Sequence, residues 1–459
     1  MSVKSIRIGN GAGFWGDNLD APRQLASHGK LDYLTLEYLA ELTLSILAYQ
    51  RSKNPESGYV TDLVKVVKDI TPQLTGDAPL KLVTNGGGMN PVGCAKAVSQ
   101  VLVDSGLPHV RVAAVAGDDL LPRLEELLNA GEVFAHFDNG QPLGQLHERI
   151  VSANAYLGAE GIVDALAENA QIVLTGRITD AALVVGPAVH EFGWSWDDWS
   201  RLGAATIAGH LIECGAQVTG GMYSDWNPSI DLGTIGYPVA NLREDGTSVI
   251  SKPSGTGGEV SIGTVSEQLI YEIGDPEKYF TPDVVADFSN VHLTQLADEE
   301  VLVEGGTGTE APPTLKVSMA YYDGFTTSGS IVVAGPQANE KAHAAAEAIR
   351  VRMKTAGYEL EHFEYECLGT GDTLPGMDLW HQSSQEIVLR IAARDHRREA
   401  IDRLTRELTP LVTSGPPGIT GYTESRARSR PVIAYWPTTI PRDMVKTSAE
   451  VRAAQEWLV

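Results

Sequence analysis

One predicted helix, residues 201–217, carries the side chains best suited to chemistry. Its sequence RLGAATIAGHLIECGAQ places His210, Glu213, Cys214 and Gln217 among small and apolar residues. Helical residues three, four and seven positions apart lie on one face, so these four side chains form one stripe. A histidine beside a carboxyl group can transfer protons near neutral pH, which makes His210 and Glu213 candidate catalytic residues. Two alternatives stay open: a Cys214 thiolate nucleophile activated by His210, and a buried His–Glu pair that only joins two elements.

Charged residues also follow strand-like runs, where open α/β sheets bind ligands. Arg177 follows an apolar run directly, and an unpaired buried guanidinium is costly, so it either pairs with Asp180 or holds an anionic substrate. Asp180 either caps the next helix or belongs with the candidate catalytic residues. Asp17, in GNGAGFWGD, and Glu37 are strand-end carboxylates that could bind substrate or act as an alternative base.

Two glycine-rich loops resemble anion cradles. In TNGGGMNP, Asn85, Gly86, Gly87 and Gly88 precede a helix for which Asn90 is the expected N-cap, and helix N-termini beside glycine loops bind anions. In KPSGTGG, the candidate anion-binding residues are Lys252, Ser254, Thr256 and Gly257. The alternative for each loop is a bend that caps a helix, and for TNGGGMNP the anion site is the favoured interpretation.

Three arginines near the C-terminus, Arg426, Arg428 and Arg430, share one face if their segment is extended. They could hold a phosphate, a carboxylate or a neighbouring acidic subunit, and a homo-oligomer is expected.

The elements that position these residues alternate strand and helix through the first two hundred residues. This order predicts an α/β fold with a doubly wound, mostly parallel sheet in the N-terminal part. A later β-α-β-β-α order predicts a smaller C-terminal α+β two-layer unit. The predicted domains are a Rossmann-like domain at 1–202, a helix with an irregular β segment at 203–327 that completes the site, and the α+β unit at 328–459.

Composition limits the partners of the 459-residue chain. The formal net charge of -24 argues against nucleic acid and anionic membranes as partners. Three cysteines without a CxxC spacing, and the lack of a signal-like or membrane-spanning apolar run, favour a reducing cytoplasm. The histidines do not cluster, so no metal site is predicted.

Several quoted stretches, in chain order, resemble the acyclic terpene utilisation (AtuA) family from the N-terminus to about residue 440. They include GNGAGFWGD, TNGGGMNP, GRITDAAL, GHLIECGAQVTGG and TPDVVADF. The resemblance implies catabolism of branched or terpenoid acids through coenzyme A thioesters, and a small companion subunit. It implies no catalytic mechanism.

The leading hypothesis is therefore a lyase or hydratase that acts on a branched carboxylic acid or its coenzyme A thioester by His/Glu proton transfer. No other cofactor is expected. The alternatives are a cysteine-dependent thioester or amide hydrolase and a non-catalytic subunit that needs a partner protein.

Overall fold

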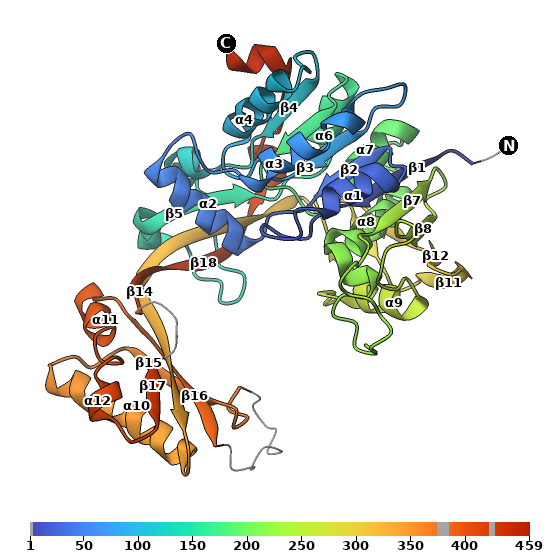
Figure 1. Cartoon of the computed structure of the whole chain (residues 1–459). Helices are drawn as coiled ribbons and strands as arrows, with labels where there is room; N and C mark the ends of the chain where they lie inside the picture. Colours follow the sequence, from blue (N-terminus) through green and yellow to red (C-terminus); the bar gives the residue numbers. More distant parts are fainter. Residues whose placement is uncertain (1–2, 374–384, 422–426) are drawn as a thin grey trace. The chain divides into compact units, whose positions relative to one another are not determined.

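A computed structural model describes residues 3–373, 385–421 and 427–459 of the chain (Figure 1). It divides into two compact units. The first unit is Met1–Ala320 together with Tyr435–Val459, and the second unit is Tyr321–Ala434. Arg426 lies outside the described residues, so the three-arginine face stays a prediction.

The centre of the first unit is a ten-stranded mixed sheet in the order β11-β12-β8-β7-β1-β2-β3-β6-β4-β19. In that order its strands are β11 (His292–Ala297), β12 (Glu300–Glu304), β8 (Ser248–Ser251), β7 (Val239–Arg243), β1 (Ser5–Asn10), β2 (Tyr33–Leu36), β3 (Lys81–Thr84), β6 (Ile172–Thr175), β4 (Arg111–Ala116) and β19 (Ser448–Ala453). The neighbours from β1 to β4 are parallel, and the remaining pairs are antiparallel.

Short connections explain why the sheet is mixed. β11 and β12 are joined by a two-residue turn in which Glu299 has a positive φ of 65°. The turn between β7 and β8 contains Gly246 at φ 91°. Parallel pairing needs a long crossover, so such tight turns require antiparallel strands. The α/β class is confirmed, the sheet as a whole is mixed, and the doubly wound arrangement stays a prediction.

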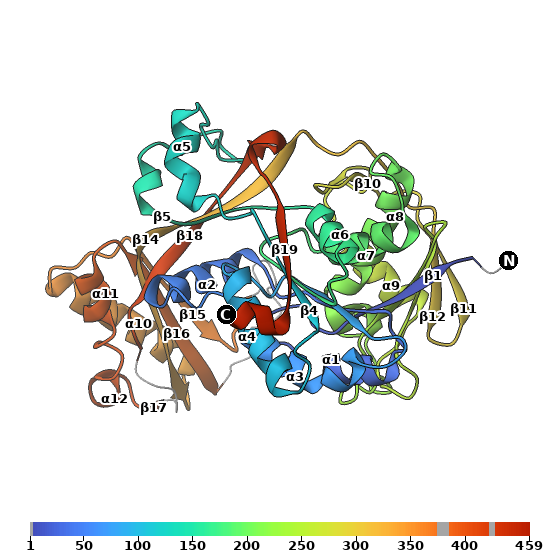
Figure 2. The same cartoon turned by 90° about the horizontal axis from the view of Figure 1, so that it is seen from above.

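Helices of the first unit form two packed groups (Figure 2). In one, α1 (Ala21–His28) and α4 (Pro91–Asp104) each pack on α3 (Asp62–Asp69). In the other, α7 (Ala182–Phe192) packs between α6 (Glu160–Ala167) and α8 (Trp199–Glu213). β2 and β6 are buried along their whole length, so the middle of the sheet lies within the apolar core.

The other elements of the first unit lie in its connections. They are α2 (Glu41–Lys53), α5 (Leu124–Asn129), β5 (Ile150–Ala155), α9 (Ile262–Ile270), β9 (Tyr279–Phe280), β10 (Val285–Asp287) and β13 (Thr307–Thr309).

The second unit has an antiparallel sheet in the order β15-β16-β14-β17. Its elements are β15 (His362–Leu368), β16 (Glu386–Asp395), β17 (Ile419–Gly421), α10 (Ala338–Thr355), α11 (Arg398–Leu404) and α12 (Leu411–Ser414); β14 (Thr314–Ala334) and β18 (Arg430–Pro441) are shared with the first unit. Alternate residues of β16 are buried, and its apolar face packs with α10 and α11 into a separate core.

Strands from both sides of residue 202 share the large sheet, and Tyr435–Val459 belong to the first unit. The sequence-based division at 202 and 327 stays a prediction about domain organisation. Among the described residues, no helix is long and apolar enough to cross a membrane.

Candidate functional site

A pocket of about 440 Å³ in the first unit collects residues that follow β1, β2 and β6 and residues at the end of α8. We call it the acidic pocket because five carboxyl groups line it. They belong to Asp17, Glu37, Asp180, Glu213 and Glu272. None of the described lining residues is lysine, arginine or histidine. The pocket lies where the strand-end rule places ligand sites.

His210 and Glu213 form the hydrogen-bonded pair that the sequence suggested. His210 Nδ1 lies 3.0 Å from Glu213 Oε1, and His210 Nε2 donates to the Gln268 carbonyl at 2.9 Å. A carbonyl can only accept, so Nε2 carries a proton. The Nδ1···Oε1 contact therefore holds one further proton, either as imidazolium with carboxylate or as imidazole with carboxylic acid.

The second oxygen of Glu213 is the unusual atom of this pair. Oε2 is buried and has no hydrogen-bond partner among the described residues, although Glu213 lines the acidic pocket. His210 is 1 % exposed, and both of its nitrogens are engaged. An unpaired buried carboxyl oxygen costs free energy, so one retained beside a pocket points to a ligand or proton-transfer role. Glu213, rather than His210, is therefore the group that can meet a substrate.

Burial sets the proton affinity of this pair. It raises the pKa of Glu213 to about 6, against the opposing effect of His210. Burial disfavours the His210 imidazolium, but the charge and hydrogen bond of Glu213 outweigh it, so the pKa of His210 is raised. The nearby charge of Asp180 also raises the pKa of Glu213. A carboxyl group with a pKa near 6 can both accept and return a proton near neutral pH.

The loop after β1 holds the end of α8 in place. Asn10 Nδ2 donates to the carbonyls of Ile212 at 2.7 Å and Glu213 at 2.9 Å. A Cβ at Gly13 would lie 2.7 Å from the Cys214 carbonyl carbon, so only glycine permits this approach. Asp17 accepts from Gly13 N at 2.8 Å and from the Tyr237 hydroxyl. The loop thereby fixes where Glu213 enters the pocket.

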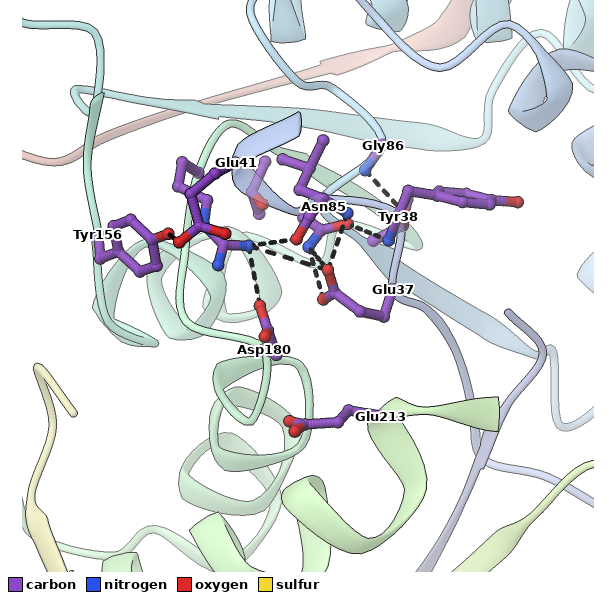
Figure 3. Close-up of polar contacts among 12 residues, drawn as sticks. Glu37, Tyr38, Glu41, Asn85, Gly86, Tyr156, Asp180 and Glu213 are labelled. Carbon is purple, nitrogen blue, oxygen red and sulfur yellow. Dashed lines mark hydrogen bonds and ion pairs between the residues drawn. The ribbon is translucent and has the colours of Figure 1, made fainter. Parts of the chain in front are cut away.

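A second carboxyl cluster contains Glu37 and Asp180 (Figure 3), and both carboxyl groups lie close to Arg177. Arg177 Nη1 donates to Asp180 Oδ1 at 2.8 Å and to the Leu39 carbonyl at 2.7 Å, and it lies 3.9 Å from Glu37 Oε1. Asn85 Nδ2 donates to both Glu37 oxygens at 2.5 Å. The structure thus shows Arg177 paired with Asp180, one of the two alternatives left open by the sequence.

Burial is also the main cause of the raised carboxyl pKa values in this cluster. It raises the pKa of Glu37 well above its ordinary value, with Asp180 adding to the rise and Arg177 opposing it. Burial also raises the pKa of Asp180, again against Arg177. Asp118 supports the arrangement from the β4 side by accepting from Arg177 N at 2.9 Å. Three carboxyl groups of the acidic pocket therefore hold protons more tightly than exposed ones do.

Cys214 and Gln217 line the acidic pocket, but the predicted helical stripe is interrupted. α8 ends at Glu213, Cys214 is its C-cap, and Gln217 lies in the 3₁₀ turn Gly215–Thr219. Cys214 therefore does not continue the His210 stripe. Burial, followed by the charge of Glu213, raises the pKa of the Cys214 thiol to about 12.

The first glycine-rich loop is packed inside the protein and does not line the acidic pocket. Gly86 N donates to Thr84 Oγ1, and Gly88 N donates to the Asn85 carbonyl. A Cβ at Gly87 would lie 2.6 Å from the Thr175 carbonyl oxygen. Asn90 caps α4 as predicted, accepting from Gly93 N at 2.9 Å. Within this loop only Asn85 reaches the site, through Glu37.

The second glycine-rich loop lies apart from the acidic pocket. Lys252 Nζ donates to the Thr256 carbonyl at 2.9 Å and pairs with Glu299 at 3.3 Å. A Cβ at Gly257 would lie 2.2 Å from a backbone oxygen, so this glycine is needed for packing. The helix that follows begins only at Ile262, where Ser261 caps it. Ser254, like Lys252, Thr256 and Gly257, does not line the acidic pocket.

Sequence reasoning missed several residues of the acidic pocket. Tyr38 and Tyr237 line it from two strand ends, and Tyr271 and Glu272 follow α9. Tyr38 lies next to Glu37, so the strand-end rule could have found it. The others arrive through long-range packing, for which the local sequence carries no signal. Among the described residues, no group of three or more His, Cys, Asp or Glu is arranged to hold a metal ion.

Comparison with known proteins agrees with the resemblance seen in the sequence. The model of the acyclic terpene utilisation family protein AtuA matches residues 6–451. Neither the curated proteins nor the solved structures include a match to this chain. The family match covers both compact units. The chain therefore belongs to the AtuA family, which links it to acyclic terpene utilisation.

Proposed function

We propose that this protein is a catabolic enzyme that adds or removes a proton and a neighbouring group, as a lyase or hydratase, on a branched or terpenoid-derived acyl substrate. Glu213 is the proposed acid–base residue, and His210 positions it and holds the exchanged proton. Family membership supports the catabolic role. The observation that carries the chemistry is the buried Glu213 Oε2 at the acidic pocket, for which the residues that the structure describes provide no hydrogen-bond partner.

Hydration and elimination need two proton-handling groups, one for carbon and one for oxygen. Asp180 is the proposed second group because it lines the same pocket and its pKa is raised. Glu37 is held by Asn85 and by Leu39 N, so its proposed role is to position Arg177 and Asp180. Tyr38 and Tyr237 provide aromatic walls for an acyl group.

The charge of the pocket favours a thioester over a free acid. Five carboxyl groups line it, and the nearby guanidinium of Arg177 is already paired with Asp180. A free carboxylate entering this environment would lose solvation without gaining an unpaired cation. The reacting end of an acyl thioester is neutral and avoids that cost. Coenzyme A is proposed only as part of such a substrate.

Thermal unfolding against a ligand panel tests the substrate class. The panel holds coenzyme A, branched acyl-coenzyme A thioesters and the corresponding free acids. A ligand present at a hundred times its Kd stabilises a protein by about 2.7 kcal/mol, which is readily detected. Larger stabilisation by thioesters than by the corresponding free acids is expected. Stabilisation by free acids alone would contradict the thioester proposal.

The proton-transfer role is tested with Glu213→Gln. The amide keeps the shape of the side chain but cannot transfer a proton, so turnover should fall by about 10²–10⁴-fold. Deuterium incorporation from D2O into α,β-unsaturated branched thioesters, followed by NMR, measures the step directly. Glu277→Gln, at an exposed position, is the control and should behave as wild type. Full activity of Glu213→Gln would reject the mechanism. If the wild-type protein is active only when a companion protein is added, the chain is instead a subunit that depends on a partner.

A further inference from the structure

A second cavity, of about 430 Å³, lies in the first unit and shares no lining residue with the acidic pocket. We call it the Phe280 cavity. Its apolar lining comes from two aromatic residues, one leucine and three prolines: Phe137, Phe280, Leu315, Pro282, Pro312 and Pro313. None of the candidate site residues named from the sequence is among its lining residues.

The proline wall leaves few polar groups for a ligand. Proline has no N–H, so these residues offer only carbonyls. The carbonyls are already used: Arg442 side-chain nitrogens donate to Pro282 and Pro312, and Arg442 N donates to Pro313 at 3.0 Å. The wall therefore presents hydrocarbon, which favours an apolar ligand.

One part of the cavity lining is polar. Lys316 Nζ lies 4.6 Å from the centre of the Tyr156 ring and pairs with Glu41 at 3.1 Å. The Tyr156 hydroxyl donates to the same Glu41 oxygen. Thr179 Oγ1, also of a lining residue, is buried and has no partner among the described residues. A single ligand hydroxyl or carboxylate could satisfy Thr179 and approach Lys316.

The cavity has an open approach. A larger groove, of about 1020 Å³, shares Phe280, Pro312 and Pro313 with it. Trp196 and Trp199 also line that groove, and each is 37 % exposed. Phe280 is 65 % exposed between the two spaces. Exposed aromatic residues beside an apolar cavity suit the entry of an aliphatic chain.

We propose that the Phe280 cavity binds an aliphatic chain, branched or linear, that carries one polar head group directed to Thr179 and Lys316. The inference goes beyond the proposed reaction and does not depend on it. The occupant is either the tail of the substrate itself or a separate lipid-like ligand. A ligand in the Phe280 cavity would affect the acidic pocket. The Arg177 guanidinium, which pairs with Asp180, lies 4.1 Å from the centre of the Tyr156 ring.

Calorimetric titration of the full chain with 3,7-dimethyloctanoate tests the binding. Glutarate, which has two charged ends and a short chain, is the ligand control and should not bind. Thr439→Phe fills the cavity from β18 and is expected to weaken 3,7-dimethyloctanoate binding by at least tenfold. Phe280→Ala, at an exposed position, is expected to weaken it by about threefold to tenfold through lost apolar contact.

Trp226→Ala is the matched control, because Trp226 is an exposed aromatic residue that lines neither the Phe280 cavity nor the acidic pocket. It should leave 3,7-dimethyloctanoate binding unchanged. The proposal is overturned if both cavity variants bind like wild type, or if Trp226→Ala weakens binding as much as they do. Competition by a branched acyl thioester would identify the substrate tail as the occupant, and simultaneous binding would identify a separate ligand. Turnover by Glu213→Gln tests the proposed function separately, so the two can fail independently.

Discussion

Two carboxyl clusters meet at the acidic pocket, and they differ in how completely they are paired. Around Arg177, Asp180 is held by the guanidinium, and Glu37 is held by Asn85 and by Leu39 N. At the end of α8, one oxygen of Glu213 lies at hydrogen-bond distance from His210, and the other has no partner in the described part of the chain. The first cluster therefore positions Asp180 and stabilises the fold around the pocket, while the second retains a carboxyl oxygen that no described residue contacts by a hydrogen bond.

The difference shows that a raised pKa alone does not identify the reactive group. Burial raises the pKa of Glu37, Asp180 and Glu213 alike. Networks that hold a fold together also perturb pKa values. What separates Glu213 is a buried carboxyl oxygen at the pocket that has no hydrogen-bond partner among the described residues. Variants that remove one partner at a time test this difference between the two clusters.

The largest effect is expected from Arg177→Met. Loss of the guanidinium leaves Asp180 and Glu37 without their buried cation, and breaking a buried ion pair in this way typically costs about 3–5 kcal/mol. The free energy of unfolding in urea measures it. Arg51→Met is the matched control, because Arg51 contacts Asp119 at the same 2.8 Å but the two side chains are 39 % and 24 % exposed. That surface pair should be worth about 1 kcal/mol or less, so equal losses would contradict a structural role for Arg177.

The second-largest effect is expected on the pH dependence of stability and comes from Asp118, which supports the Arg177 cluster. Burial raises its pKa from 3.8 to about 6. A carboxyl group with a raised folded-state pKa contributes stability below pH 3.8 and loses it as the pH rises through about 6. Relative to Asp118→Asn, the wild type should therefore lose on the order of 2–3 kcal/mol between pH 4 and pH 7. Urea unfolding across this range measures the difference, and parallel pH curves for the two proteins would contradict it.

Particular residues show how far the sequence alone predicts this arrangement. The spacing of Arg177 and Asp180 predicted their pairing as one of two options, and Asn90 was predicted as a cap, because both contacts are local. The strand-end rule pointed to Asp17, Glu37 and Asp180, and all three line the acidic pocket.

Other parts of the site depend on where the chain turns in three dimensions. The helical period could not show that α8 ends at Glu213, where Asn10 from the N-terminal strand caps it. No local motif could show that Lys252 pairs with Glu299, because the two residues lie far apart in the sequence. Tyr237 and Glu272 join the acidic pocket for the same reason.

A smaller effect is expected when the partner of Glu213 is removed by His210→Gln. The positive charge and hydrogen bond of His210 lower the pKa of Glu213, so their loss should raise that pKa further above about 6. If Glu213 acts as a base, the acid limb of the kcat profile moves to higher pH, and kcat at pH 7 falls by about 10–100-fold. Thr206→Val, which changes a buried polar residue on the same helix, is the control. An unmoved acid limb would mean that His210 has only a packing role.

The smallest effect is expected from Cys214→Ala. Burial raises the pKa of the thiol to about 12, so almost no thiolate exists near pH 7, and the thiolate is the form that attacks carbon. Turnover should stay within about twofold of wild type, and the free energy of unfolding should fall by about 1 kcal/mol, as for a typical substitution. Complete loss of turnover, together with rapid alkylation of wild-type Cys214 by iodoacetamide in mass spectrometry, would instead support the cysteine hydrolase. Because Cys214 and Glu213 are adjacent and line the same pocket, opposite results for Cys214→Ala and Glu213→Gln would show which of these two side chains takes part in the reaction.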